Sequence, residues 1–95
     1  MAHKVIWTLN AVSDVHDLAE YISRDSYHYA ELVEDRIHQA ADSLAYFPLR
    51  HRIVPEFDRA DVREIFVHNY RIIYHVSDDC VTILSVIHTA RDLTD

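Results

Sequence analysis

The spacing between apolar residues changes twice along this chain, and these changes restrict the folds that it can adopt. Residues 4 to 9 follow a two-residue period, with Val5, Trp7 and Leu9 on one side. Between residues 11 and 44 the spacing becomes three and four, and after Pro48 it returns to two. A period of two is typical of a half-buried strand, and spacings of three and four are typical of one face of a helix. The predicted order is therefore strand, helix, helix and then further strands.

The helical region divides into two helices that form a hairpin. The first is expected to end near Arg24 and the second to run until Pro48. The candidate N-caps are Asn10 or Ser13 for the first helix and Asp25 or Ser26 for the second. The two apolar stripes consist of Ala11, Val15, Leu18, Ala19 and Ile22, and of Ala30, Val33, Ile37, Ala40, Ala41 and Leu44.

Three strands are expected after the helices, at residues 62–67, 70–76 and 80–88, separated by short turns at residues 68–69 and 77–79. Strands linked by such turns pair most simply as an antiparallel meander, to which the first strand adds. We therefore predict an α+β fold with one four-stranded sheet and both helices on one face. Because the chain contains no glycine, Asn, Asp, Ser or His must supply any positive φ in the turns.

Length and composition indicate a single small domain, residues 1–95, without resident cofactors. No apolar run approaches the roughly 20 residues that span a bilayer, and no secretory signal is visible, so we place the protein in the cytoplasm. Cys80 is the only cysteine, which excludes an internal disulfide. The eight histidines are scattered without metal-ligand spacing, and no metal site is predicted.

The formal net charge of −7 argues against general affinity for a phosphate backbone, which depends on a surplus of Lys and Arg. Much of the acidity falls on the outer faces of the predicted helices, which we interpret as solvated surface. These acidic residues are Asp14, Asp17, Glu20, Glu31, Glu34, Asp35 and Asp42. A nucleic-acid function would require a local basic patch elsewhere.

Five segments together resemble the RelE/ParE toxin superfamily of bacterial type II toxin–antitoxin systems, in family order and across nearly the whole chain. They are Trp7 with Asp17-Leu18 and Tyr21-Ile22, Arg52-Ile53-Val54-Pro55-Glu56, Val62-Arg63-Glu64-Ile65, Tyr70-Arg71-Ile72-Ile73-Tyr74, and Val86-Ile87-His88-Thr89-Ala90-Arg91-Asp92-Leu93. The toxin function comes from this resemblance and not from the periodicity.

The resemblance implies one of two activities. RelE-like members are ribosome-dependent ribonucleases that cut messenger RNA, whereas ParE-like members act on DNA gyrase. This sequence is more similar to the ParE side, because it ends in the pattern His88-x-x-Arg91 and lacks a terminal catalytic Tyr. It also has His51-Arg52 where the RelE-type loop has paired Lys. We therefore expect gyrase inhibition without catalysis, with a RelE-like ribonuclease as the alternative and an inactive family member as a third interpretation.

The resemblance also implies a cognate antitoxin and a toxin–antitoxin hetero-oligomer. We expect an antitoxin that folds on binding and lays a helix or strand over this domain. The reason is that the apolar stripes of two helices cannot all be hidden by one small sheet.

The candidate site residues depend on which activity is present. In a ribonuclease, Glu56, Arg71 and His88 would supply the base, the cation and the acid that RNA cleavage requires. The candidate residues for contact with a target or antitoxin are Arg52, Arg63, Tyr70 and Arg91. In a meander, Arg63 and Arg71 are expected on the same sheet face, and the arginines and His88 are expected to form one basic patch.

Each candidate also has a structural interpretation. Glu56 and Glu64 are typical partners for Arg52, Arg63 or Arg71 in ion pairs at a sheet surface. His88 is more often a hydrogen-bonded residue at a strand end than a catalyst. Tyr70 shares a strand face with Ile72, which favours packing.

Overall fold

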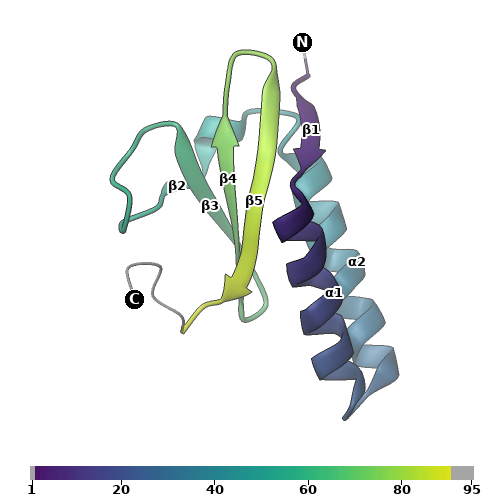
Figure 1. The fold of residues 1–95 in the computed structure, drawn as a ribbon. Coiled ribbons are helices and arrows are strands. Elements are labelled where there is room, and N and C mark those ends of the chain that lie inside the picture. Colours follow the sequence, from purple (N-terminus) through teal and green to yellow (C-terminus); the bar gives the residue numbers. More distant parts are fainter. Residues whose placement is uncertain (1, 91–95) are drawn as a thin grey trace.

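The computed structural model describes residues 2–90 and confirms the α+β fold class, with a helical hairpin on one side of a single sheet (Figure 1). The elements are β1 (Lys4–Trp7), α1 (Leu9–Ser23), α2 (Tyr27–Ser43), a 3-10 turn (Pro48–Arg50), β2 (Arg52–Ile53), β3 (Val62–Val67), β4 (Tyr70–Val76) and β5 (Cys80–His88). None of the described helices is long and apolar enough to cross a lipid bilayer.

The sheet has five strands and not the expected four, in the order β1-β5-β4-β3-β2. Strands β2 to β5 pair antiparallel, and β1 lies parallel to β5, with Lys4 opposite Cys80 and Trp7 opposite Ile83. The additional strand, β2, pairs Arg52 with Glu64. A segment of two residues is too short to show a period, so β2 can be recognised only by its pairing with β3.

The helix boundaries differ from the sequence prediction at two ends. Thr8 caps α1, because its Oγ1 accepts a hydrogen bond of 3.0 Å from the backbone N–H of Ala11. The predicted caps Asn10 and Ser13 were therefore wrong, and Leu9 begins α1 instead of ending β1. Ser26 caps α2 as predicted. That helix ends at Ser43, before Pro48.

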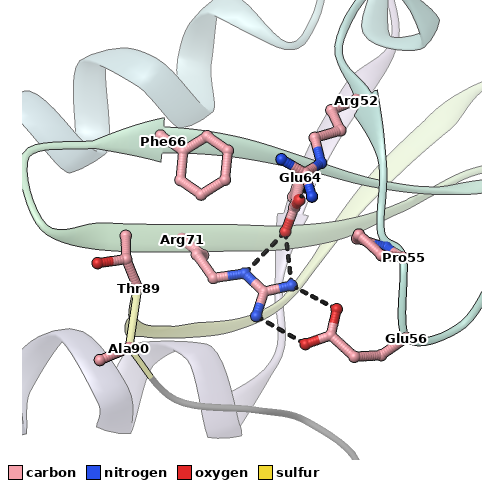
Figure 2. Close-up of a pocket in the computed structure, with 8 residues that line it drawn as sticks. All are labelled: Arg52, Pro55, Glu56, Glu64, Phe66, Arg71, Thr89 and Ala90. Carbon is pink, nitrogen blue, oxygen red and sulfur yellow. Dashed lines mark hydrogen bonds and ion pairs between the residues drawn. The ribbon is translucent and has the colours of Figure 1, made fainter.

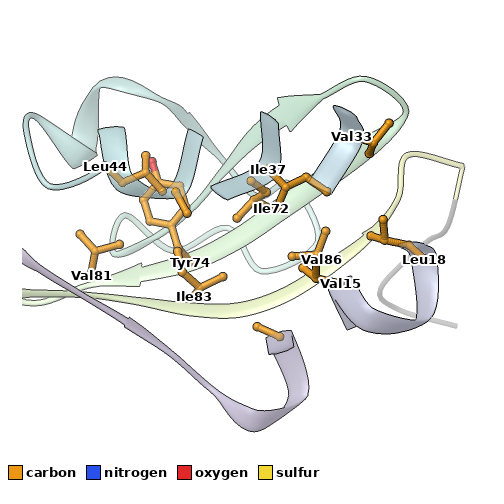
Figure 3. Close-up of a cluster of buried hydrophobic side chains, with 12 residues drawn as sticks. Val15, Leu18, Val33, Ile37, Leu44, Ile72, Tyr74, Val81, Ile83 and Val86 are labelled. Atoms are coloured by element: carbon orange, nitrogen blue, oxygen red, sulfur yellow. The ribbon is translucent and has the colours of Figure 1, made fainter. Parts of the chain in front are cut away.

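The main core lies between the helices and one face of the sheet (Figure 3). Val33, Ile37 and Leu44 on the helical side meet Ile72 and Tyr74 on the sheet, and all five have 0% of their surface exposed. Complete burial of one such aliphatic side chain contributes about 1.5–3 kcal/mol. Both predicted helical stripes are buried or half-buried, so they do not leave the uncovered apolar surface that the sequence led us to expect.

The opposite face of the sheet carries a smaller apolar cluster beneath the segment that joins β2 to β3. Val54, Val62 and Ile73 are buried there, and Leu84 packs against them. Leu84 lies at a shift in the register of β4 and β5, between Ile83, which is opposite Tyr74, and Ser85, which is opposite Ile73. The site described below lies on this face, beside the cluster.

One tight turn and two loops contain residues with positive φ although the chain lacks glycine. His68 (φ 54°) lies in the predicted two-residue turn, and Asp58 (φ 50°) lies between β2 and β3. His and Asp are among the residues that tolerate this conformation. Phe47 (φ 53°) precedes the 3-10 turn and is the unexpected member of this group.

Candidate functional site

Arg71 in β4 is the centre of a charged cluster on the sheet face opposite the helices (Figure 2). Its Nη1 and Nη2 donate to the two carboxylate oxygens of Glu56 at 2.8 and 2.9 Å, and its Nε donates to Glu64 Oε1 at 2.7 Å. Arg71 is 6% exposed and Glu64 is 1% exposed. Charges buried this deeply require partners. Hydrogen bonding to Glu56, and secondarily to Glu64, raises the pKa of Arg71 above its usual range.

Arg52 in β2 completes the cluster from the edge of the sheet. Its Nε lies 3.0 Å from Glu64 Oε2, and its guanidinium carbon lies 5.7 Å from the centre of the Phe66 ring. That carboxylate oxygen is buried and receives no hydrogen bond from residues 2–90, so its contact with Arg52 is an ion pair. The two arginines and two glutamates carry no net charge together.

The cluster lines a pocket of about 360 Å³. Pro55 and Phe66 form apolar parts of its wall, and Thr89 and Ala90 after β5 form another side (Figure 2). Within the described residues, no group of three or more His, Cys, Asp or Glu side chains is arranged to hold a metal ion.

The strand register contradicts the expected single basic patch. Arg63 lies opposite Tyr74, whereas Arg71 lies opposite Phe66. Directly opposed residues project from the same face and successive residues alternate, so Arg63 and Arg71 lie on opposite faces of the sheet. The turn between two strands sets their register, and the register decides which of their residues share a face. The two-residue period within each strand does not reveal it.

Arg63 holds loops together and is not part of the pocket. Its Nη1 donates to the carbonyl oxygens of Leu49 (2.8 Å) and His51 (2.9 Å), and its Nε donates to that of Ala60 (2.8 Å). A planar guanidinium can satisfy several carbonyl groups at once. Arg63 therefore links the loop after α2 to the beginning of β3.

His88 and Tyr70 also lie on the helix-side face, because they oppose each other in β5 and β4 while Arg71 opposes Ile87. Their rings meet edge to face with centres 5.6 Å apart. His88 Nδ1 accepts a hydrogen bond of 3.1 Å from the N–H of Ala90. His88 is thus a hydrogen-bonded residue at the end of β5, and its catalytic role stays a prediction. Arg91 lies outside the described residues.

The sequence predicted the ion pairs of Glu56 and Glu64 but placed them at the surface. Glu64 is instead buried in β3, and the segment after β2 brings the half-buried Glu56 over the sheet. The sequence did not identify Phe66 as part of the pocket wall. Phe66 follows Glu64 by two residues in β3, so the two side chains lie on the same face of the sheet. Asp14 was expected to be solvated, but its Oδ2 accepts a hydrogen bond of 2.9 Å from the N–H of Val86.

A helical hairpin covers one face of a mainly antiparallel sheet, and a paired arginine lies on the other face, so the chain is a small α+β protein. The family model described as "ParE toxin of type II toxin-antitoxin system, parDE" matches residues 5–93. The chain belongs to this family and is a toxin of the ParE/RelE type.

Relatives with names from both branches are found. The chain is 37% identical over 89 residues to Toxin RelE2 of Caulobacter vibrioides, covering 93% of this chain and 97% of the relative. The structure of the RelBE2 toxin–antitoxin complex from Mycobacterium tuberculosis is similar with a TM-score of 0.66 and 25% identity, over 93% of this chain and 99% of that one. The chromosomal ParDE system from P. aeruginosa has a TM-score of 0.75 and 16% identity, over 92% and 96%, a likeness of fold alone.

Proposed function

We propose that this toxin inhibits bacterial growth from within the cytoplasm by binding DNA gyrase, without cutting RNA, and that a cognate antitoxin neutralises it. The observation that carries the proposal is the state of Arg71. Its guanidinium is engaged by the carboxylates of Glu56 and Glu64 and is nearly buried. A cation in this state offers little charge to a phosphate.

The geometry also separates the three groups that a ribonuclease would need. Cleavage at one phosphate requires a base, a cation and an acid that converge on the same atoms. Glu56 and Arg71 are together, but His88 lies on the other face of the sheet. The net charge of −7 further opposes docking against ribosomal RNA. Binding is therefore favoured, and the ParE side of the family makes gyrase the target.

A RelE-like, ribosome-dependent ribonuclease is the second candidate, because the curated relative at 37% identity is named RelE2. Both candidates require an antitoxin. The RelBE2 neighbour is described as a toxin–antitoxin complex, which supports the same kind of hetero-oligomer for this chain.

The proposal is tested by giving the purified toxin both targets in parallel. We expect it to block DNA supercoiling by purified gyrase and to leave messenger RNA on translating ribosomes intact. Codon-specific cuts in the ribosomal A site, with gyrase unaffected, would reverse the assignment. Addition of the antitoxin should restore supercoiling.

A further inference from the structure

The loop between α2 and β2 presents large apolar side chains that the core does not use. Tyr46 is 64% exposed, Phe47 is 75% exposed and Leu49 is 54% exposed. Phe47 and Leu49 line a hollow of about 660 Å³ whose wall also includes His3, Pro48 and Val76. Tyr46 lines a second hollow of about 330 Å³, which shares His3, Phe47 and Pro48 with the first. We call Tyr46, Phe47 and Leu49 with these hollows the loop surface. Contiguous exposed apolar surface of this kind marks interaction sites.

The loop is held in place by bonds to three distant parts of the fold. The buried hydroxyl of Tyr74 donates to Pro48 O at 2.6 Å. Arg63 Nη1 donates to Leu49 O at 2.8 Å, and the N–H of His3 donates to Ala45 O at 2.8 Å. Groups held rigidly before binding lose less conformational entropy when a partner arrives.

Phe47 has an unfavourable backbone conformation in addition to its exposed ring. Its φ of 53° and ψ of 52° lie in the left-handed region, which is costly for a residue with a Cβ atom. Burial within the chain itself does not offset this cost, because Phe47 is 75% exposed. Strained residues that persist in a fixed loop cluster at ligand-binding positions.

The charge of this segment is opposite to that of the protein as a whole. Residues 46–55 contain two arginines and one histidine but no Asp or Glu, in a chain of net charge −7. Arg50 lines the larger hollow, and within residues 2–90 no ion pair involves it. A partner that fits the loop surface therefore combines apolar side chains with acidic ones.

We infer that the loop surface binds an amphipathic helical segment of the antitoxin, with its apolar face in the hollows and acidic residues beside Arg50. The inference rests on the proposed neutralisation by an antitoxin. A permanent partner fits better than a transient target, because permanent interfaces are more apolar than transient ones. An amphipathic helix laid into an apolar groove is a recurrent mode of recognition. The apolar stripes of the two helices are already buried or half-buried within the fold, so we assign the contact to the loop surface.

The central variant is Phe47→Gly, because glycine adopts the left-handed conformation without cost and so removes the ring while preserving the loop. Leu49→Ala tests the apolar contact a second time, and Arg50→Glu tests the charge. Tyr27→Ala and Arg24→Glu are matched controls at the other end of α2, which is about 25 Å long. Tyr27 is 71% exposed, close to the exposure of Phe47.

Binding to the purified antitoxin encoded beside the toxin is measured by titration calorimetry, with circular dichroism as the check on folding. We expect each of the three loop variants to weaken binding by about tenfold or more, and the controls to change it by less than about twofold. A folded Phe47→Gly protein that binds the antitoxin as tightly as the parent would overturn the inference. Loss of gyrase inhibition with unchanged antitoxin binding would assign the surface to the target and overturn it equally.

The proposed function fails in a different way. If the parent protein leaves gyrase active but the loop variants still lose the antitoxin, then the gyrase assignment is wrong and the loop surface stands. If the parent protein binds no antitoxin, both are overturned.

Discussion

The fold shields the charged guanidinium of Arg71 from water, together with the carboxylates of Glu56 and Glu64. The carboxylate of Glu64, which is 1% exposed, remains acceptable in the interior only while the guanidinium is beside it. Removal of one partner from such a pair leaves an uncompensated buried charge. Arg71 therefore stabilises the fold, whether or not it also contacts a target. A variant of Arg71 can lose toxicity because it is less stable.

Arg71→Ala is expected to destabilise the protein by about 3–5 kcal/mol, because Glu64 loses its principal partner. From the sequence alone we would predict that this variant folds normally and loses toxicity. The buried cluster shows that loss of toxicity would not by itself indicate a lost contact. Urea denaturation measures the effect. Glu64→Gln added to Arg71→Ala should recover part of the loss, and a single variant as stable as the parent would contradict this account of the cluster.

Tyr74 makes stability depend on alkaline pH. Burial raises its pKa to about 12, and its hydroxyl must remain protonated to donate to Pro48 O. The unfolded tyrosine loses its proton near pH 10, so the folded state binds more protons between about pH 10 and 12, and stability falls as pH rises through this window. The loss should be on the order of 2 kcal/mol.

Thermal unfolding at several alkaline pH values measures this dependence. Tyr74→Phe is the control: it should be less stable at neutral pH, because Pro48 O loses its donor, and should show a weaker decline above pH 10. An equal decline in both proteins would assign the effect to other groups.

At the scale of elements, the sequence predicted each helix and the long strands, because these segments have enough residues to show a period. It did not predict β2, whose two residues become a strand only by pairing with β3. It also extended the first strand too far, since Leu9 continues the alternation of Val5 and Trp7 but belongs to α1. The hydroxyl of Thr8 decides this boundary, because it satisfies the N–H of Ala11.

Thr8→Ala should therefore cost about 1 kcal/mol, the usual effect of losing an N-cap side chain. Thr8 Oγ1 also donates to Ile83 O at 3.0 Å, so the loss should not be smaller than that. Ser13→Ala, at a residue that the sequence alone offered as a cap, should change stability by less than about 0.5 kcal/mol. Equal unfolding midpoints in urea for Thr8→Ala and the parent would show that the cap does not stabilise α1.

For the whole molecule, the fold class could be predicted from the order in which strand-like and helix-like spacings occur along the sequence. Which residues come together at the site could not be predicted in this way. Which arginines share a sheet face depends on the register between β3 and β4, and a change of one residue reverses it. Likewise, the position of Glu56 over Arg71 depends on a long-range contact of the segment after β2. Both are tertiary properties that local spacing does not contain.

The central claim for the whole molecule is that the toxin acts by binding and not by proton transfer at His88. The most direct measurement is growth arrest by His88→Gln compared with the parent protein at equal expression. His88 lies across the sheet from Arg71, so the variant should be as toxic as the parent. If His88 instead donates a proton during RNA cleavage, the variant should lose activity by roughly a hundredfold or more and cells should grow, and that result would contradict the account.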